Sequence, residues 1–212
     1  MGLMQSEEKG RLLYVLADGL LRENVPEGTE GAKLRVVKDD AGNVKAEKWE
    51  LTYPGITGFI TGVTTFDGEY GVNILISMKD ENEEEFTVSL KASSMYGEDF
   101  LHKLPNVDMS KEITLKGYNF EAEGGRKMTG ITMTQDVGGQ ATKLRNAFNY
   151  KENDKWVTPI EGYPQPDDKK PPKNSEAWKI FFAQRREWVV EYLTEKGLLT
   201  EATPAEASDD EF

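Results

Sequence analysis

The chain has 212 residues, no Cys, 37% hydrophobic residues and a net charge of −12 at pH 7. This length supports one good hydrophobic core, and the absence of Cys excludes disulfides, thiolate catalysis and Cys-ligated zinc and fits a reducing cytoplasm. No run of 18 apolar residues occurs and the first ten residues have no apolar h-region, so we expect neither a membrane span nor a secretory signal.

The first third of the sequence predicts a hairpin followed by one long bent strand. Residues 33–38 and 44–53 flank a turn-forming segment at 39–43, which is typical of a β-hairpin. The long strand is expected over residues 48–66, interrupted at Pro54-Gly55. Glycines at 58 and 62 would give this strand the backbone freedom that barrel corners need.

Alternating apolar residues predict four further strands, separated by turn residues. A short helix is expected over residues 95–104 between the second and third of them, because Pro105 stops a run in which Phe100, Leu101 and Leu104 share one face. The four strands are residues 70–78, 86–92, 113–120 and 128–134.

This order of elements indicates a mainly β protein with an OB-fold-like Greek-key barrel, in which a short helix lies between strands 3 and 4. A β-sandwich also uses alternating strands but calls for no helix at that point. We therefore expect one OB-like domain over residues 1–200, with the core barrel at about residues 44–135 and an extra N-terminal hairpin.

Three segments follow the predicted barrel. Residues 136–173, the arm, are rich in turn residues and scattered aromatics and predict an extended functional loop. Residues 174–196 predict an amphipathic helix that ends at Gly197, and we expect it to dock on the barrel, with a homodimer seam as the alternative. Residues 201–212 have five acids and no Lys or Arg, which predicts a disordered acidic tail.

The residues that could carry catalysis are sparse. The single His, at 102, lies in the predicted short helix with no Cys or second His to complete a metal site or a triad, and we expect a surface or half-packed position for it. No Gly-Lys-Ser/Thr motif follows the glycines, so a phosphate-binding loop is excluded. We predict no enzyme activity, no metal and no cofactor.

The distribution of charge leaves room for a nucleic-acid site. The net charge is −9 over residues 1–114, +2 over residues 115–200 and −5 over residues 201–212. Because charges are screened beyond about 8 Å at physiological salt, a local basic groove can bind phosphates on an acidic protein.

Aromatic residues interleaved with cations are the main functional signal. In residues 113–120, alternation places Ile113 and Leu115 on one face and Lys116, Tyr118 and Phe120 on the other. Bases stack on exposed rings regardless of sequence. The alternative for each ring is burial under the C-terminal helix or the N-terminal hairpin. The predicted single-stranded DNA contacts are Lys91, Lys116, Tyr118, Phe120, Arg126, Lys127, Lys143, Arg145, Phe148, Tyr150, Lys151 and Trp156.

A small barrel with outward rings and cations, then a helix and an acidic tail ending in Asp209-Asp210-Glu211-Phe212, resembles the single-stranded DNA-binding proteins of phage and bacterial replication. The resemblance implies sequence-independent binding of single-stranded DNA in replication, recombination and repair. It also implies that Asp209, Asp210, Glu211 and Phe212 recruit a polymerase, helicase or primase and compete for the DNA groove. The location it implies is the cytoplasm, that of the host cell if a phage encodes the chain.

Two other classes of function remain open. A phage structural or assembly protein would use the β-domain and the C-terminal helix as protein interfaces. An OB-type hydrolase or nuclease would require clustered carboxylates with metal-dependent activity, for which the sequence gives little.

Overall fold

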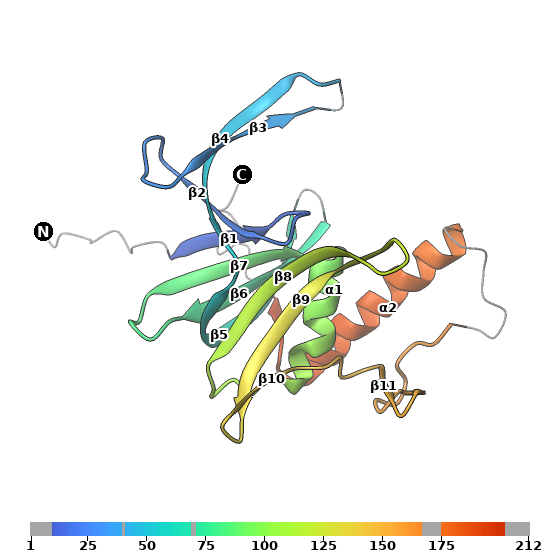
Figure 1. The fold of residues 1–212 in the computed structure, drawn as a ribbon. Helices are drawn as coiled ribbons and strands as arrows, with labels where there is room; N and C mark the ends of the chain where they lie inside the picture. The colour runs from blue at the N-terminus through green and yellow to red at the C-terminus, as the bar shows by residue number, and fades with distance from the viewer. Residues whose placement is uncertain (1–9, 40, 69–70, 167–174, 202–212) are drawn as a thin grey trace, which may run out of the picture.

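The protein is mainly β, and its described residues form a large mixed sheet and two α-helices (Figure 1). The computed structural model describes residues 10–39, 41–68, 71–166 and 175–201. The predicted acidic tail, residues 201–212, lies outside the described residues except for Glu201. The strands of the sheet are β1 (Arg11–Val15), β2 (Leu21–Val25), β3 (Lys33–Lys38), β4 (Val44–Tyr53), β5 (Ile56–Gly68), β6 (Gly71–Lys79), β7 (Glu85–Lys91), β8 (Ile113–Ala122), β9 (Arg126–Val137), β10 (Gln140–Lys143) and β13 (Thr200–Glu201).

The path of strands through the sheet is β10-β9-β8-β5-β6-β7-β1-β2-β4-β3. Strand β5 pairs with two strands in succession. Its residues 56–58 pair with β8, and its residues 59–68 pair with β6. A register shift between Ile60 and Gly62 marks the bend. Further along β5, β13 pairs in parallel with Thr64 and Thr65. The change of partner and of register thus falls within the segment that contains Gly58 and Gly62.

Among the described residues, β7 and β9 do not pair with each other. Instead β1 runs parallel to β7, and the turn between β1 and β2 reaches β8, where Asn119 donates to the carbonyl oxygen of Ala17. At β9, a side chain of the helix over residues 95–103 takes the place of a strand partner. The backbone amide of Ile131 donates a hydrogen bond to the Asp99 carboxylate at 2.8 Å.

The predicted strand over residues 48–66 is in fact two strands. Pro54 and Gly55 separate β4 from β5, and β4 pairs with β2 and β3 rather than continuing into β5. The N-terminal hairpin, defined here as β3 and β4, projects away from the rest of the molecule (Figure 1). A proline cannot donate a ladder hydrogen bond, which explains why the strand breaks there.

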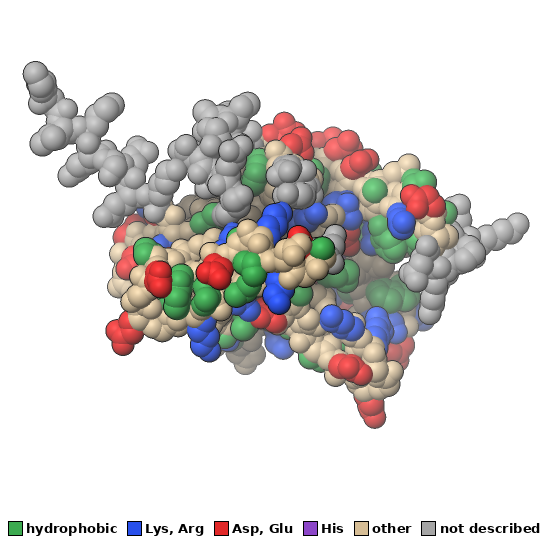
Figure 2. All heavy atoms as spheres, turned by 90° about the horizontal axis from the view of Figure 1, so that it is seen from above, with side chains coloured by type: hydrophobic (Ala, Val, Ile, Leu, Met, Phe, Trp, Pro, Cys, Tyr) green, Lys and Arg blue, Asp and Glu red, His purple; other side chains and the backbone are tan. Residues whose placement is uncertain are grey.

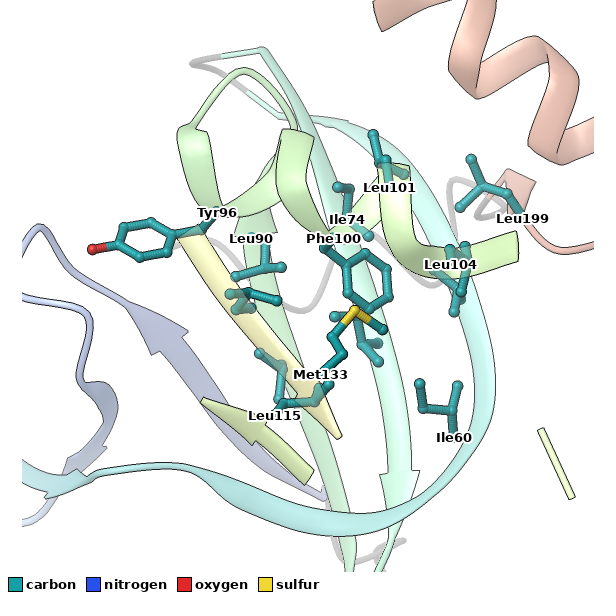
Figure 3. Close-up of a cluster of buried hydrophobic side chains, with 14 of the residues drawn as sticks. Ile60, Ile74, Leu90, Tyr96, Phe100, Leu101, Leu104, Leu115, Met133 and Leu199 are labelled. Atoms are coloured by element: carbon teal, nitrogen blue, oxygen red, sulfur yellow. The ribbon is translucent and has the colours of Figure 1, made fainter. Parts of the chain in front are cut away.

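Helix α1 (Met95–Lys103) forms where the sequence predicts it. Ser94 caps it by accepting from the amide of Gly97 at 3.0 Å, and a short 3-10 turn, η1 (Leu104–Asn106), contains Pro105. The buried residues of α1 pack against the inward-facing side chains of the strands. In Figure 3, Phe100 lies against Met133, with Leu115, Leu90 and Ile74 nearby.

The arm is more structured than the sequence indicates. After β10 the chain forms a separate small hairpin from β11 (Tyr150–Glu152) and β12 (Lys155–Val157). Residues 167–173 of the arm lie outside the described residues. Two buried residues, Phe148 and Tyr163, attach the arm to the core.

Helix α2 (Glu176–Glu195) docks by its C-terminal half. Val189 and Leu193 are buried there, and Arg186 forms an ion pair with Glu98 of α1 at 2.6 Å. Gly197 adopts a φ of 68°, and the amide of Leu198 donates to the carbonyl of Leu193 at 2.9 Å, which is the predicted C-terminal cap.

Candidate nucleic-acid interface

The outer face of the β8–β9 hairpin carries the predicted ring-and-cation pattern. Ile113 and Leu115 are buried, as the alternation predicts, while Lys116 and Phe120 on the opposite face are exposed. Opposed residues of an antiparallel pair share a face, and Arg126 on β9 stands opposite Ala122, two residues beyond Phe120. The strip formed by Lys116, Tyr118, Phe120 and Arg126 therefore has a cation at each end and two rings between them.

The two rings of this strip differ in exposure. Phe120 is 54% exposed, and its centroid lies 5.8 Å from that of Tyr118. Tyr118 is half-buried because Gly130, directly opposite on β9, leaves room for its hydroxyl beside the Asp99 carboxylate. Burial, and secondarily Asp99, raise the pKa of Tyr118. Phe120 is thus the ring that offers a free surface for stacking.

The cations of this region are available for a ligand. Within the described part of the chain, Lys116, Arg126 and Lys127 make no ion pair with a carboxylate, and all three are exposed. Lys116 lies across Gly55, where a Cβ atom would come 2.7 Å from the carbonyl oxygen of Leu115. Gly55 therefore lets β5 approach β8 closely beneath the Lys116 side chain.

Phe148, predicted as a DNA contact, is a core residue. Its side chain is 0% exposed, and its ring contacts those of His102, Tyr163, Trp188 and Tyr192 at centroid distances of 5.6, 5.2, 6.1 and 5.4 Å. The prediction was wrong because the arm folds back at this point: the amide of Ala147 donates to the carbonyl of His102 at 2.8 Å.

A second group of predicted contacts gathers at the β11–β12 hairpin. The Arg145 guanidinium lies 3.7 Å from the centroid of Tyr150, and the Lys151 ammonium lies 5.6 Å from that of Trp156, its cross-strand partner. Trp156 is 66% exposed. Lys143 is exposed on β10, four residues after Gly139. This hairpin is a separate two-stranded unit, so the structure does not join its rings to the strip on β8–β9.

Lys91 lies on a different part of the sheet. It is exposed at the end of β7, opposite Asn73 of β6. The predicted residues therefore fall into three places, namely β7, the β8–β9 hairpin and the segment from Lys143 to Trp156. Figure 2, seen from above, shows Lys and Arg side chains interspersed with acidic and hydrophobic ones instead of one uniform basic field.

His102 packs against the rings of Phe148 and Tyr163 in the arm. The Nε2 atom of His102 and the Tyr163 hydroxyl share a hydrogen bond of 3.3 Å. Burial, and secondarily the positive charge of Arg185, lower the pKa of His102 to about 4. It is therefore neutral at pH 7. In the described ranges no three His, Asp or Glu side chains cluster so as to hold a metal ion, and no described helix could cross a membrane.

Sequence reasoning missed the cations of the N-terminal hairpin. The strand predicted over residues 33–38 contains three Lys or Arg residues, none of which is among the predicted DNA contacts. The signal that could have identified them is the alternation of Lys33, Leu34, Arg35 and Val36, which puts charge on one face and apolar groups on the other.

Comparisons of this chain with protein-family models, with curated proteins and with solved structures find no match.

Proposed function

We propose that this protein binds single-stranded DNA without sequence specificity and acts in replication, recombination or repair. The observation that carries the proposal is the strip on β8–β9, in which exposed Phe120 lies between Lys116 and Arg126. A free aromatic face stacks on any base, and flanking cations contact the phosphates on either side. Such a pattern needs no base-specific hydrogen bonds.

The order of elements supports an OB-type barrel as the scaffold for this function. Strands β5, β6 and β7, then α1, then β8 and β9 follow one another, and β8 returns to pair with the start of β5. In an OB-fold the loop between the fourth and fifth strands helps to bind oligonucleotides. In this assignment that loop joins β8 to β9, next to Arg126 and Lys127.

The acidic C-terminal residues complete the proposal. Asp209, Asp210, Glu211 and Phe212, outside the described residues, combine negative charge with an aromatic ring, which suits a basic, partly apolar pocket on a replication protein. As a polyanion the same segment competes with DNA for the cationic strip.

One observation favours a different class of function, that of a structural or assembly protein. The N-terminal half of α2 exposes Ile180 and Phe182, at 52% and 38%. An apolar helix face of this kind suits a protein interface, including a homodimer seam.

A filter-binding titration with a dT 30-mer separates the two classes. The DNA-binding function predicts saturable retention, together with quenching of Trp fluorescence as bases approach exposed Trp156. An assembly protein gives no saturable binding, and that result would reject the proposal.

A further inference from the structure

The N-terminal hairpin has a polar face with an excess of positive charge. Lys33 stands opposite Glu50, and Arg35 stands opposite Lys48. Because opposed residues of antiparallel strands point to the same side, these four side chains share one face. Leu34, 44% exposed, lies on the other face.

This face continues without a break across the neighbouring strands. Arg22 of β2 stands opposite both Thr52 of β4 and Tyr14 of β1. Tyr14 in turn lies beside Ser89 of β7, two residues before Lys91. Neighbouring strands are about 4.8 Å apart, so the face spans about 19 Å from β3 to β7.

The charges of the face leave lysines free for a ligand. Arg22 and Arg35 are both paired with Glu50, at 3.2 and 2.6 Å. In the part of the chain that the structure describes, Lys33, Lys48 and Lys91 have no ion pair and no hydrogen bond from the ammonium group. An anionic ligand on this face would therefore displace no described carboxylate from them.

Glu50 holds the projecting hairpin in a fixed position. Its carboxylate, 2% exposed, accepts hydrogen bonds from Tyr14 of β1, Arg22 of β2 and Arg35 of β3. One buried group on β4 thus ties four strands together. Hydrogen bonds from three neighbouring strands to one buried carboxylate restrict the position of β4, although the Arg22 Nε atom has no hydrogen-bond partner among the described residues. The lysines are therefore presented on an ordered support.

We infer that this face, from Lys91 across Arg22 to Lys48 and Lys33, binds the sugar-phosphate backbone of the same single strand whose bases stack on the β8–β9 strip. The inference rests on the proposed function. The face is polar, with Thr52, Ser89 and Tyr14 among the cations, which suits phosphate contacts better than an apolar protein interface. Exposed apolar side chains of the hairpin lie on the opposite side, as Leu34 shows.

The test is the salt dependence of binding to a dT 30-mer by the full-length chain carrying Lys33→Gln and Lys48→Gln. Each phosphate contact contributes about 0.7 to the slope of log K against log salt for a single strand, so losing two contacts should reduce the slope by about 1.4. The matched control, Lys179→Gln with Lys196→Gln, makes the same change of net charge on exposed positions of α2 and its end, and should leave the slope unchanged.

The outcomes separate this inference from the proposed function. If the unmodified chain fails to bind the 30-mer, the proposed function is rejected and the inference with it. If it binds and the Lys33/Lys48 variant keeps the full slope, only the inference is overturned, and the face is free for another partner such as a protein. Thermal unfolding of both variants checks that they fold.

A third arm addresses the acidic C-terminal residues. The Lys33/Lys48 pair of substitutions is repeated in a full-length chain with Asp209→Asn, Asp210→Asn and Glu211→Gln. If the reduction in slope persists, the face binds DNA itself. If the reduction disappears, the face instead holds the acidic segment of this chain, and the inference is overturned.

Discussion

Gly117 of β8 packs directly against Gly19 in the turn between β1 and β2. A Cβ atom at Gly117 would overlap the carbonyl oxygen of Gly19, and the neighbouring carbonyl of Ala17 accepts from Asn119 and from Tyr96. This contact joins the N-terminal strands to β8 on the side where, among the described residues, β7 and β9 do not pair with each other. The position of the N-terminal hairpin, and of Lys33 and Lys48 on it, depends on this junction.

Gly117→Ala should destabilise the protein by about 2 kcal/mol, because backbone atoms on both sides must separate to admit a methyl group. Chemical denaturation measures the free energy of unfolding. Gly62→Ala is the matched control within a strand, since nothing lies within 4 Å of a Cβ at that position. Equal stability of the two variants would contradict the junction.

Phe148 and Phe120 should respond oppositely to truncation. Phe148→Ala removes a fully buried ring and should cost about 4 kcal/mol of stability. Phe120→Ala should change stability by less than about 0.5 kcal/mol and weaken binding to oligo-dT by about 1–3 kcal/mol.

Thermal unfolding and equilibrium titration of the two variants provide the check. A Phe120→Ala variant with unaltered DNA affinity would remove the strip on β8–β9 from the interface. A Phe148→Ala variant as stable as the parent would contradict the core position of that ring.

Glu50 should make stability depend on pH on the acid side. Burial alone raises its pKa, but hydrogen bonds from Arg35, Tyr14 and Arg22 outweigh burial and the net pKa lies below the ordinary 4.5. A carboxylate with a lowered folded-state pKa stabilises the protein above its unfolded-state pKa, and this contribution is lost as pH falls through the folded-state value. Glu50→Gln should therefore cost about 2 kcal/mol at pH 7.

The difference in unfolding free energy between the parent and Glu50→Gln should shrink as pH decreases below about 4.5, the ordinary Glu pKa. Glu47→Gln, on the same strand but exposed, is the control and should show no such difference. A parent–variant difference that stays constant between pH 7 and pH 3 would show that Glu50 is not ionised in the network.

Neutralising Asp209, Asp210 and Glu211 should tighten binding to oligo-dT at low salt, because a competing polyanion is removed. Fluorescence titration at two salt concentrations measures the effect, which should fade as salt increases. Unchanged affinity at low salt would reject the competition between this segment and DNA.

Local patterns in the sequence predict β6, β7, β8 and β9 and their buried faces, but neither β1 and β2 nor the short strands after β9. In β7, the alternation of Phe86, Val88 and Leu90 places all three in the core, and α1 ends just before Pro105 as expected. Period and capping depend on near neighbours in the chain, which the sequence displays directly.

Long-range contacts explain what the sequence could not predict. Phe148 and Tyr150 lie in the same stretch of alternating aromatic and basic residues. Phe148 is nevertheless buried by Trp188 and Tyr192, which are 40 or more positions away, whereas Tyr150 lies in the small hairpin beneath Arg145. Likewise, the partners of Glu50 come from three other strands, at positions 14, 22 and 35. The spacing of residues along the chain predicts neither the burial of Phe148 nor the partners of Glu50.

The measurement that tests DNA binding most directly is the titration of a dT 30-mer with the full-length chain across a range of salt concentrations. DNA binding through phosphate contacts predicts saturable binding whose log K falls linearly with log salt, with a slope of about −0.7 for each phosphate contacted. Absence of saturable binding at the lowest salt, or affinity that does not change with salt, would contradict it.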